Sequence, residues 1–185
     1  MRVFGFAGLF VFGVIVGALL YSYAPTFLQT SASEPPLNFV AVSDRIQTSG
    51  QPTEAQLVGL KAAGYDLVIN LAPPQTIGSI PHEGKLIAQM GLVYVNIPVD
   101  WENPTVHDFE LFSAILKKSE ANRVLVHCQI NRRASVFAFL YRVVHEGVAP
   151  DQAYDNVRQL WVPNARWTEF SKSVLMRSKI DFAPF

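Results

Sequence analysis

Three short segments rich in apolar residues, which alternate with helical patterns, constrain the fold of this chain more than any other feature. They are Leu67–Leu71, Val93–Ile97 and Arg123–His127. Continuous apolar runs of this length are typical of strands that are buried on both faces, as in a parallel sheet. Because helical segments separate them, we expect an α/β domain with a central, mostly parallel sheet flanked by helices.

Capping and turn residues place the remaining elements. Thr53-Glu54-Ala55-Gln56 is a capping-box pattern that opens a helix, and Gly64 is expected to close it as a left-handed cap. Phe39–Val42 and Arg45–Gln47 are predicted to form two short strands that pair. Further helices are predicted to end near Gly91, to open at Thr105, to cover Ala134–Glu146 and to begin near Pro150 and Trp167.

The N-terminal residues 3–22 contain no charged side chain and are long enough to cross a bilayer core as a helix. Arg2 precedes this run and no basic residue follows until Arg45, so the positive-inside rule places the following domain outside the cytoplasm, on the periplasmic side in a bacterium. We predict a single-pass membrane anchor over 1–22, a linker over 23–38 and a globular domain over 39–185. The alternative is a cleaved signal peptide, although no good cleavage site follows the run.

Composition argues against several classes of protein. Lysine plus arginine and aspartate plus glutamate both number 15, so the chain lacks the basic excess of a nucleic-acid-binding protein. A single cysteine excludes a disulfide framework and a zinc-cysteine cluster. The four histidines do not occur at metal-ligand spacing. We therefore expect neither a nucleic-acid partner nor a metal or other cofactor.

The segment from His127 to Ser135 contains the candidate chemistry. Cys128 follows an apolar strand, and a short loop with Arg132 and Arg133 leads into an apolar helix. Backbone N–H groups at such a helix start can surround an anion and stabilise a thiolate. Arg133 supplies a planar fork for two oxygens, and Asn131 tolerates left-handed backbone angles. A single cysteine can also be a small buried apolar residue, but this surrounding pattern favours a reactive nucleophile.

This segment resembles the active-site loop of the cysteine-dependent protein tyrosine and dual-specificity phosphatases. In that superfamily, His-Cys is followed by five residues, an arginine and usually a serine or threonine. Here the arginine comes one position earlier, at Arg133, and Ser135 falls where the hydroxyl residue of the superfamily stands.

A closer resemblance is to the bacterial phosphatase-like family that includes the beta-lactamase-hydrolase-like proteins. It covers about residues 39–165, and that family also places the arginine five positions after the cysteine. The shared motifs are Ser49-Gly50-Gln51-Pro52-Thr53, Gly64, Val68-Ile69-Asn70-Leu71, Gly91-Leu92-Val93-Tyr94 and Ile97-Pro98-Val99. The resemblance implies a tyrosine/dual-specificity-phosphatase-like fold and hydrolysis of a phosphorylated substrate.

The same resemblance implies an aspartate on a separate loop that protonates the leaving group. Asp100 is the best candidate, because it ends the strand Val93–Val99 beside the end of the strand that carries Cys128. Glu102 and Asp108 are alternatives, although Asp108 is expected to support the start of its own helix.

Substrate-binding roles are assigned to the other residues of the loop. His127 is expected to lie behind the cysteine and orient the loop by hydrogen bonding. Ser135 could donate to the thiolate, or alternatively to the helix backbone. Arg132 is expected to face solvent, where it could meet an anionic substrate. The predicted substrate-binding set is His127, Gln129, Ile130, Asn131, Arg132 and Ser135.

These observations favour a membrane-anchored cysteine phosphatase in which Cys128 forms a phosphocysteine, Arg133 stabilises the transition state and Asp100 protonates the leaving group. Two alternatives remain open. A rhodanese-like sulfurtransferase also uses a loop with arginine five positions after cysteine, and would carry a persulfide on Cys128. A catalytically inactive phosphate-binding module is the third reading.

Overall fold

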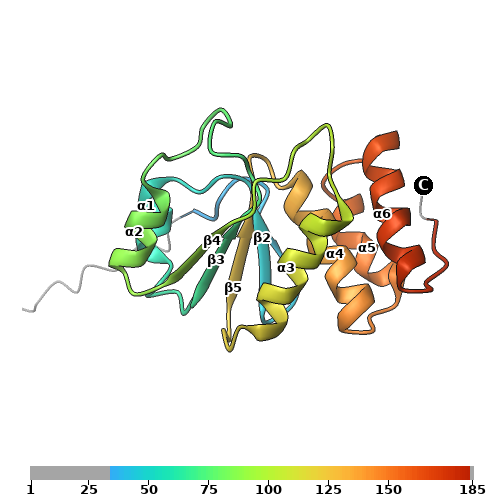
Figure 1. The fold of residues 1–185 in the computed structure, drawn as a ribbon. Helices are drawn as coiled ribbons and strands as arrows, with labels where there is room; N and C mark the ends of the chain where they lie inside the picture. Colours follow the sequence, from blue (N-terminus) through green and yellow to red (C-terminus); the bar gives the residue numbers. More distant parts are fainter. Residues whose placement is uncertain (1–33, 184–185) are drawn as a thin grey trace, which may run out of the picture. The chain divides into compact units, whose positions relative to one another are not determined.

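The computed structural model describes residues 34–183, which form a five-stranded mixed sheet with helices on both faces (Figure 1). The strand order is β1-β2-β5-β3-β4. β1 (Val40–Ala41) pairs antiparallel with β2 (Ile46–Ser49). The predicted apolar runs become β3 (Leu67–Asn70), β4 (Val93–Asn96) and β5 (Val124–His127), and the remaining neighbours pair in parallel. The predicted α/β fold with a mostly parallel sheet is confirmed.

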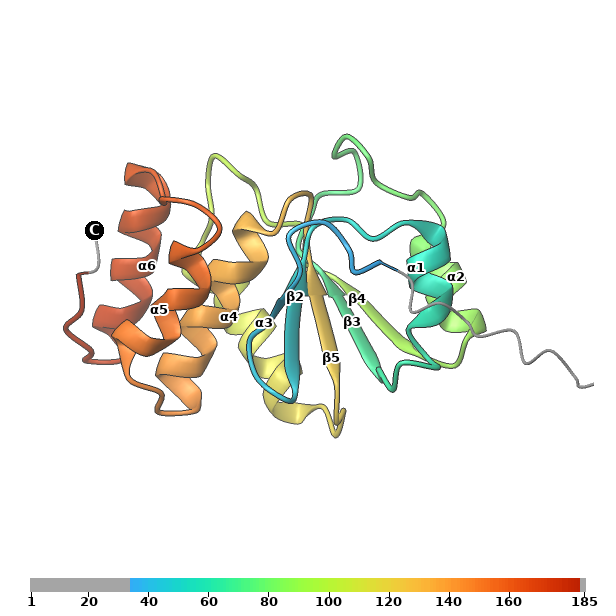
Figure 2. The same cartoon turned by 180° about the vertical axis from the view of Figure 1, so that it is seen from behind.

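Two helical layers cover the sheet, as Figures 1 and 2 show from opposite sides. The thinner layer contains α1 (Glu54–Gly59) and α2 (Glu83–Gln89), and the thicker layer contains α3 (Val106–Lys118), α4 (Arg132–His145), α5 (Pro150–Arg158) and α6 (Ala165–Arg177). Each layer encloses its own apolar core against the sheet. The central position of α4 agrees with its nearly continuous burial from residue 133 to residue 141.

The alternation of side chains along β5 divides the active-site segment between these two cores. Val126 and Cys128 belong to the core under α3 and α4, whereas Leu125 belongs to the core under α1 and α2. Successive residues of a strand face opposite sides of a sheet, so His127 faces α2 while Cys128 faces α4. The nucleophile candidate and the preceding histidine therefore contact different parts of the domain.

Helix starts follow the predicted capping residues with one correction. Thr53 with Gln56, and Thr105 with Asp108, both form reciprocal capping boxes. The helix that was predicted over Ala134–Glu146 begins earlier, at Arg132. It starts there because Asn131 takes a left-handed conformation (φ 67°) that ends the loop, and the carbonyl of Asn131 already accepts the N–H of Ser135 (3.1 Å).

The predicted membrane anchor over residues 3–22 lies outside the described residues. Within residues 34–183, no helix combines the length and the apolar character needed to span a membrane. The last residues of the predicted linker pack on the domain. The carbonyl of Leu37 accepts the N–H of Gly50 (2.7 Å), and the carbonyl of Glu34 accepts the side-chain amide of Gln56 (2.8 Å).

Candidate active site

Cys128 lies immediately after β5, the strand that pairs with β2 on one side and β3 on the other. Its N–H donates to the carbonyl of Ser49 (3.2 Å), which continues the strand pairing to the thiol. The side chain is almost completely buried, at 1% exposure, yet it lines a pocket of about 370 Å³. The pocket is lined by Trp101, Cys128, Gln129, Ile130, Arg132 and Arg133. The structure therefore brings together most of the predicted loop residues.

The loop after Cys128 is held in shape by hydrogen bonds to β2 and to the segment before β1. The side-chain amide of Asn131 donates to the carbonyl of Asn38 (2.5 Å) and to the hydroxyl of Thr48 (3.0 Å). The carbonyl of Gln129 accepts the N–H of Gln51 (3.0 Å). Asn131 is fully buried and does not line the pocket. Its side chain supports the loop through these hydrogen bonds.

The two arginines at the start of α4 have different surroundings. Arg133 is 7% exposed, and its guanidinium lies 5.4 Å from the centre of the Trp101 ring. The Nε atom of Arg133 is buried and has no hydrogen-bond partner within residues 34–183. Arg132 is exposed and lies over the ring of Trp161 at 5.4 Å. Arg133 therefore offers an unsatisfied donor inside the site, and Arg132 stands at its solvent side, as predicted.

The loop between β4 and α3 closes one side of the pocket through Trp101, which the sequence analysis did not assign. The Trp101 ring packs against Trp161 and Trp167 with centroid distances of 5.5 and 5.1 Å. The indole N–H of Trp167 donates to the carbonyl of Trp101 (3.2 Å). In the sequence, the available signal for Trp101 was its position next to Asp100, the predicted proton donor. This contact network fixes the loop that carries Asp100.

The three candidate carboxylates for proton donation have separate environments. Asp108 accepts from the N–H of Thr105 (2.9 Å), so it caps α3 as expected. Glu102 pairs with Arg166 at 3.1 Å on the surface. Asp100 is exposed, does not line the pocket, and accepts the N–H of Glu102 (2.9 Å). Of the three, Asp100 is the carboxylate that neither caps a helix nor forms a described ion pair.

Ser135 and His127 lie beside the pocket without lining it. The hydroxyl of Ser135 donates to the carbonyl of Arg132 (3.0 Å) and accepts the indole N–H of Trp161 (3.3 Å). This is the backbone-bonded alternative for Ser135, and it leaves no hydroxyl proton for the thiolate in this arrangement. His127 is fully buried on the opposite face of the sheet, where its Nε2 lies 2.7 Å from Oε1 of Glu83.

Glu83, at the start of α2, is a buried carboxylate that the sequence analysis missed. It is 2% exposed, and Ile87, one turn further along α2, is also buried. An acidic residue on the apolar face of a helix was the available signal. Burial and the charge of Glu83 raise the pKa of the nearby Tyr94 hydroxyl above its usual value, while a hydrogen bond from Asn70 opposes the rise.

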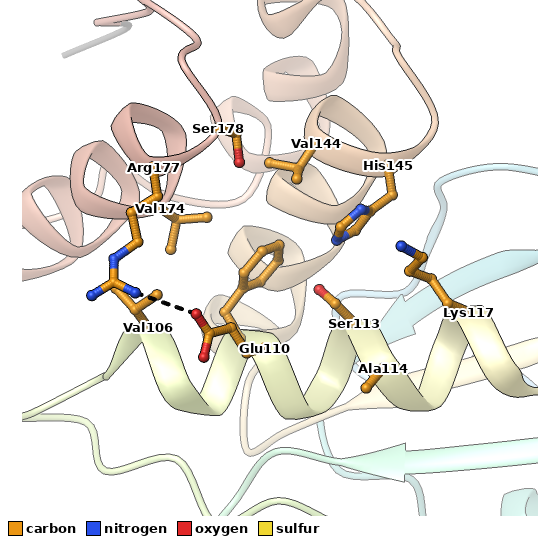
Figure 3. Close-up of a pocket in the computed structure, with 11 residues that line it drawn as sticks. Val106, Glu110, Ser113, Ala114, Lys117, Val144, His145, Val174, Arg177 and Ser178 are labelled. Carbon is orange, nitrogen blue, oxygen red and sulfur yellow. Dashed lines mark hydrogen bonds and ion pairs between the residues drawn. The ribbon is translucent and has the colours of Figure 1, made fainter.

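A second pocket of about 280 Å³ lies between α3, α4 and α6 and shares no residue with the Cys128 pocket (Figure 3). Its lining combines apolar side chains with Lys117 and His145. Burial, and to a lesser extent the charge of Lys117, lowers the pKa of His145. Within residues 34–183, no three histidine, cysteine or acidic side chains gather closely enough to hold a metal ion.

Comparison with known proteins identifies relatives of this chain, although no family model matches it. The solved structure of a DUF442 candidate phosphatase from Shewanella putrefaciens CN-32 is 38% identical, with a TM-score of 0.71. The alignment covers 77% of this chain and 94% of that one. A beta-lactamase hydrolase-like protein from Xylella fastidiosa is 28% identical over 119 residues. That match covers 63% of this chain and 27% of the length of the relative.

More distant structures share the fold. A PP-IP phosphatase core domain from S. cerevisiae is 19% identical, with a TM-score of 0.63 over 77% of this chain and 86% of that one. The motifs, the cysteine loop and the extensive match to the Shewanella protein point to one assignment. This chain belongs to the bacterial phosphatase-like family of the DUF442 and beta-lactamase-hydrolase-like proteins, and it shares the fold of the tyrosine and dual-specificity phosphatases.

Proposed function

We propose that this protein hydrolyses a phosphate monoester through a phosphocysteine intermediate on Cys128. The main support is that Cys128 and Arg133 line one pocket, and that the buried Nε of Arg133 has no hydrogen-bond partner within residues 34–183. α4 begins at Arg132, so the N–H groups of its first turn have no intrahelical acceptor and carry partial positive charge. A thiolate and a phosphoryl group both benefit from that field.

In the first chemical step, the Sγ of Cys128 attacks phosphorus, the S–P bond forms and the bond from phosphorus to the leaving oxygen breaks. The equatorial phosphoryl oxygens accept hydrogen bonds from the loop N–H groups and from Arg133. In the second step, a water oxygen attacks phosphorus, the S–P bond breaks and the thiolate is restored. Inorganic phosphate and an alcohol or phenol are the products, so no oxidant or reductant is consumed.

Asp100 supplies the proton that the leaving oxygen needs, because an alkoxide is a poor leaving group. In the second step the same carboxylate takes a proton from the attacking water. In the structure Asp100 accepts a hydrogen bond from its own loop, and the neighbouring Trp101 is part of the pocket. A small rotation of the Asp100 side chain out of that turn is therefore part of the proposal.

The test is a kinetic assay of the full chain in detergent, with an aryl phosphate and with thiosulfate as separate substrates. We expect a burst of phenol from the aryl phosphate that disappears in Cys128→Ser, because this loop does not ionise a serine hydroxyl as it can a thiol. Wild-type-like turnover by Cys128→Ser would refute the phosphocysteine. Sulfur transfer from thiosulfate without phosphatase activity would support the sulfurtransferase, and anion binding without either activity would support the inactive module.

We also propose that residues 3–22 hold this domain at a membrane, with the catalytic side outside the cytoplasm. The support is the uncharged length of the segment and the distribution of basic residues around it. This proposal is independent of the chemistry at Cys128.

A further inference from the structure

Glu83 lies at the point where four separate segments of the chain meet. Its Oε1 is 2.7 Å from Nε2 of His127, and its Oε2 accepts from the side-chain amides of Gln51 (3.0 Å) and Asn70 (3.5 Å). The amide of Asn70 also donates to the hydroxyl of Tyr94 (3.1 Å). Gln51, Asn70 and Tyr94 come from three of the motifs on which the family resemblance rests, and His127 directly precedes Cys128. The motifs therefore converge on a residue that none of them contains.

The carboxylate and the imidazole are both removed from water, with side-chain exposures of 3% for Glu83 and 0% for His127. A buried carboxylate is costly unless it is paired and hydrogen-bonded. The Oε1 atom of Glu83 is close enough to Nε2 of His127 for an ion pair, but the two groups are not aligned as a hydrogen bond requires. Packing therefore holds the carboxylate and the imidazole together on this face of the sheet.

Two connections lead from Glu83 to the loop that surrounds the thiol. One runs through His127, which directly precedes Cys128 in the chain. The other runs through Gln51, whose side chain donates to Glu83 and whose N–H donates to the carbonyl of Gln129 (3.0 Å). Glu83 therefore contacts the supports of the loop on both sides of Cys128, although it does not line the pocket.

We propose that Glu83 is a positioning residue for the nucleophile: its carboxylate holds the His127 imidazole with a proton on Nε2, and the ring fixed in this way orients the segment that presents Cys128 to the loop N–H groups. The inference deepens the proposed function and rests on it only for its kinetic measurement. Through Gln51 the same carboxylate also supports the backbone of the loop. Glu83 does not touch the substrate and takes no part in bond making.

The other titratable groups near the pair include Tyr94, His82 and Lys85, which line one pocket with Glu83, and Cys128 and Arg133. Tyr94 comes from β4, and Asn70 lies between its hydroxyl and Glu83. Cys128 and Arg133 lie on the opposite face of the sheet, toward α4. Arg133 acts on the thiolate independently of Glu83, so removal of the Glu83 charge should weaken the thiolate without abolishing it.

The experiment compares Glu83→Gln with Glu54→Gln in the full chain. Glutamine keeps an acceptor for Gln51 but loses the charge. Glu54 is a matched control, because it pairs with His82 at 3.3 Å while both side chains are more than half exposed, and exposed pairs contribute little. The readout is the rate at which iodoacetamide alkylates Cys128, the only cysteine in the chain, measured as a function of pH.

We expect Glu83→Gln to lower the alkylation rate at neutral pH by at least about threefold, because the loop N–H groups that stabilise the thiolate are then held less firmly in place. The alkylation profile should move to higher pH, and kcat on an aryl phosphate should fall while KM changes little. Glu54→Gln should match the wild type in every measurement. An alkylation profile of Glu83→Gln that coincides with the wild type would overturn the proposal.

A second measurement uses the unaltered chain, because removing one partner of a buried pair can prevent folding. Nitrogen NMR of the histidine side chains reports which ring nitrogen of His127 carries a proton. We expect a proton on Nε2 at neutral pH, exchanging slowly with water. An unprotonated Nε2 would contradict the proposal whether or not the protein hydrolyses phosphate, which separates this failure from failure of the proposed function.

Discussion

Exchange of each neighbouring arginine for lysine tests the loop most directly, because the two side chains differ in burial and orientation. Arg133 is 7% exposed, with an unsatisfied Nε inside the site, whereas Arg132 is exposed and packs on Trp161. Lysine keeps the positive charge at both positions but removes the planar fork that can bind two oxygens at once. Arg133→Lys therefore loses geometry at the proposed anion site, and Arg132→Lys loses it at the exposed side of the pocket.

The magnitude follows from the contact that is lost. Replacing a bidentate contact by a single one removes about one hydrogen bond to a charged group, worth about 2–3 kcal/mol in the transition state, so kcat should fall by roughly 30- to 150-fold. At Arg132 the loss is a surface contact with an aromatic ring, worth under about 1 kcal/mol. Arg132→Lys should therefore change the rate by less than about fivefold.

Steady-state kinetics of both variants on one aryl phosphate give the comparison, with thermal unfolding to show that both remain folded. The fall for Arg133→Lys should appear in kcat more than in KM, because the phosphoryl oxygens gain charge in the transition state. If Arg132 is the sensitive position, or if neither exchange has an effect, then the assignment of Arg133 to the anion is wrong.

Three further predictions address the support of the loop, the pH dependence of folding and the N-terminus. In Gly50→Ala, the new Cβ would lie 3.0 Å from the carbonyl oxygen of Gln129; we expect a stability loss of about 1–3 kcal/mol in urea unfolding, with a lower kcat. The pKa of His145 is lowered in the folded state. The unfolded chain therefore binds more protons as the pH falls through the ordinary histidine value of 6.5. The free energy of unfolding should decrease there, and urea titrations should show a smaller decrease in Lys117→Met. N-terminal sequencing of the mature protein should recover residues 3–22, and a start at or beyond residue 25 would refute the anchor.

The sequence was sufficient for the fold because its signals are local. Continuous apolar runs identified β3, β4 and β5, and the Thr53 capping box identified the start of α1. The start of α4 was placed two residues late, at Ala134, because the apolar pattern begins there, whereas the helix starts directly after the left-handed Asn131. That conformation at Asn131 depends on partners distant in the sequence, Asn38 and Thr48, which hold its side chain.

Two residues that line the candidate site, Cys128 and Arg133, were predicted from the sequence, and their catalytic roles stay predictions, whereas Trp101 was not predicted. Cys128 and Arg133 follow from one continuous motif, and the structure places both in one pocket. Trp101 lines that pocket only because Trp161 and Trp167 hold its loop, a long-range contact without a sequence pattern. Non-local packing of this kind decides which residues near a motif actually line the site.

Glu83 shows how the motifs acquire a physical explanation from the structure. Gln51, Asn70 and Tyr94 each occur in a separate motif, and individually each could be a solvated polar residue. The hydrogen bonds join them to one buried carboxylate whose other oxygen faces His127. A buried charge requires such partners, because each unpaired polar contact would be costly away from water. Residues of motifs that are separate along the chain therefore meet around one buried carboxylate behind the nucleophile strand.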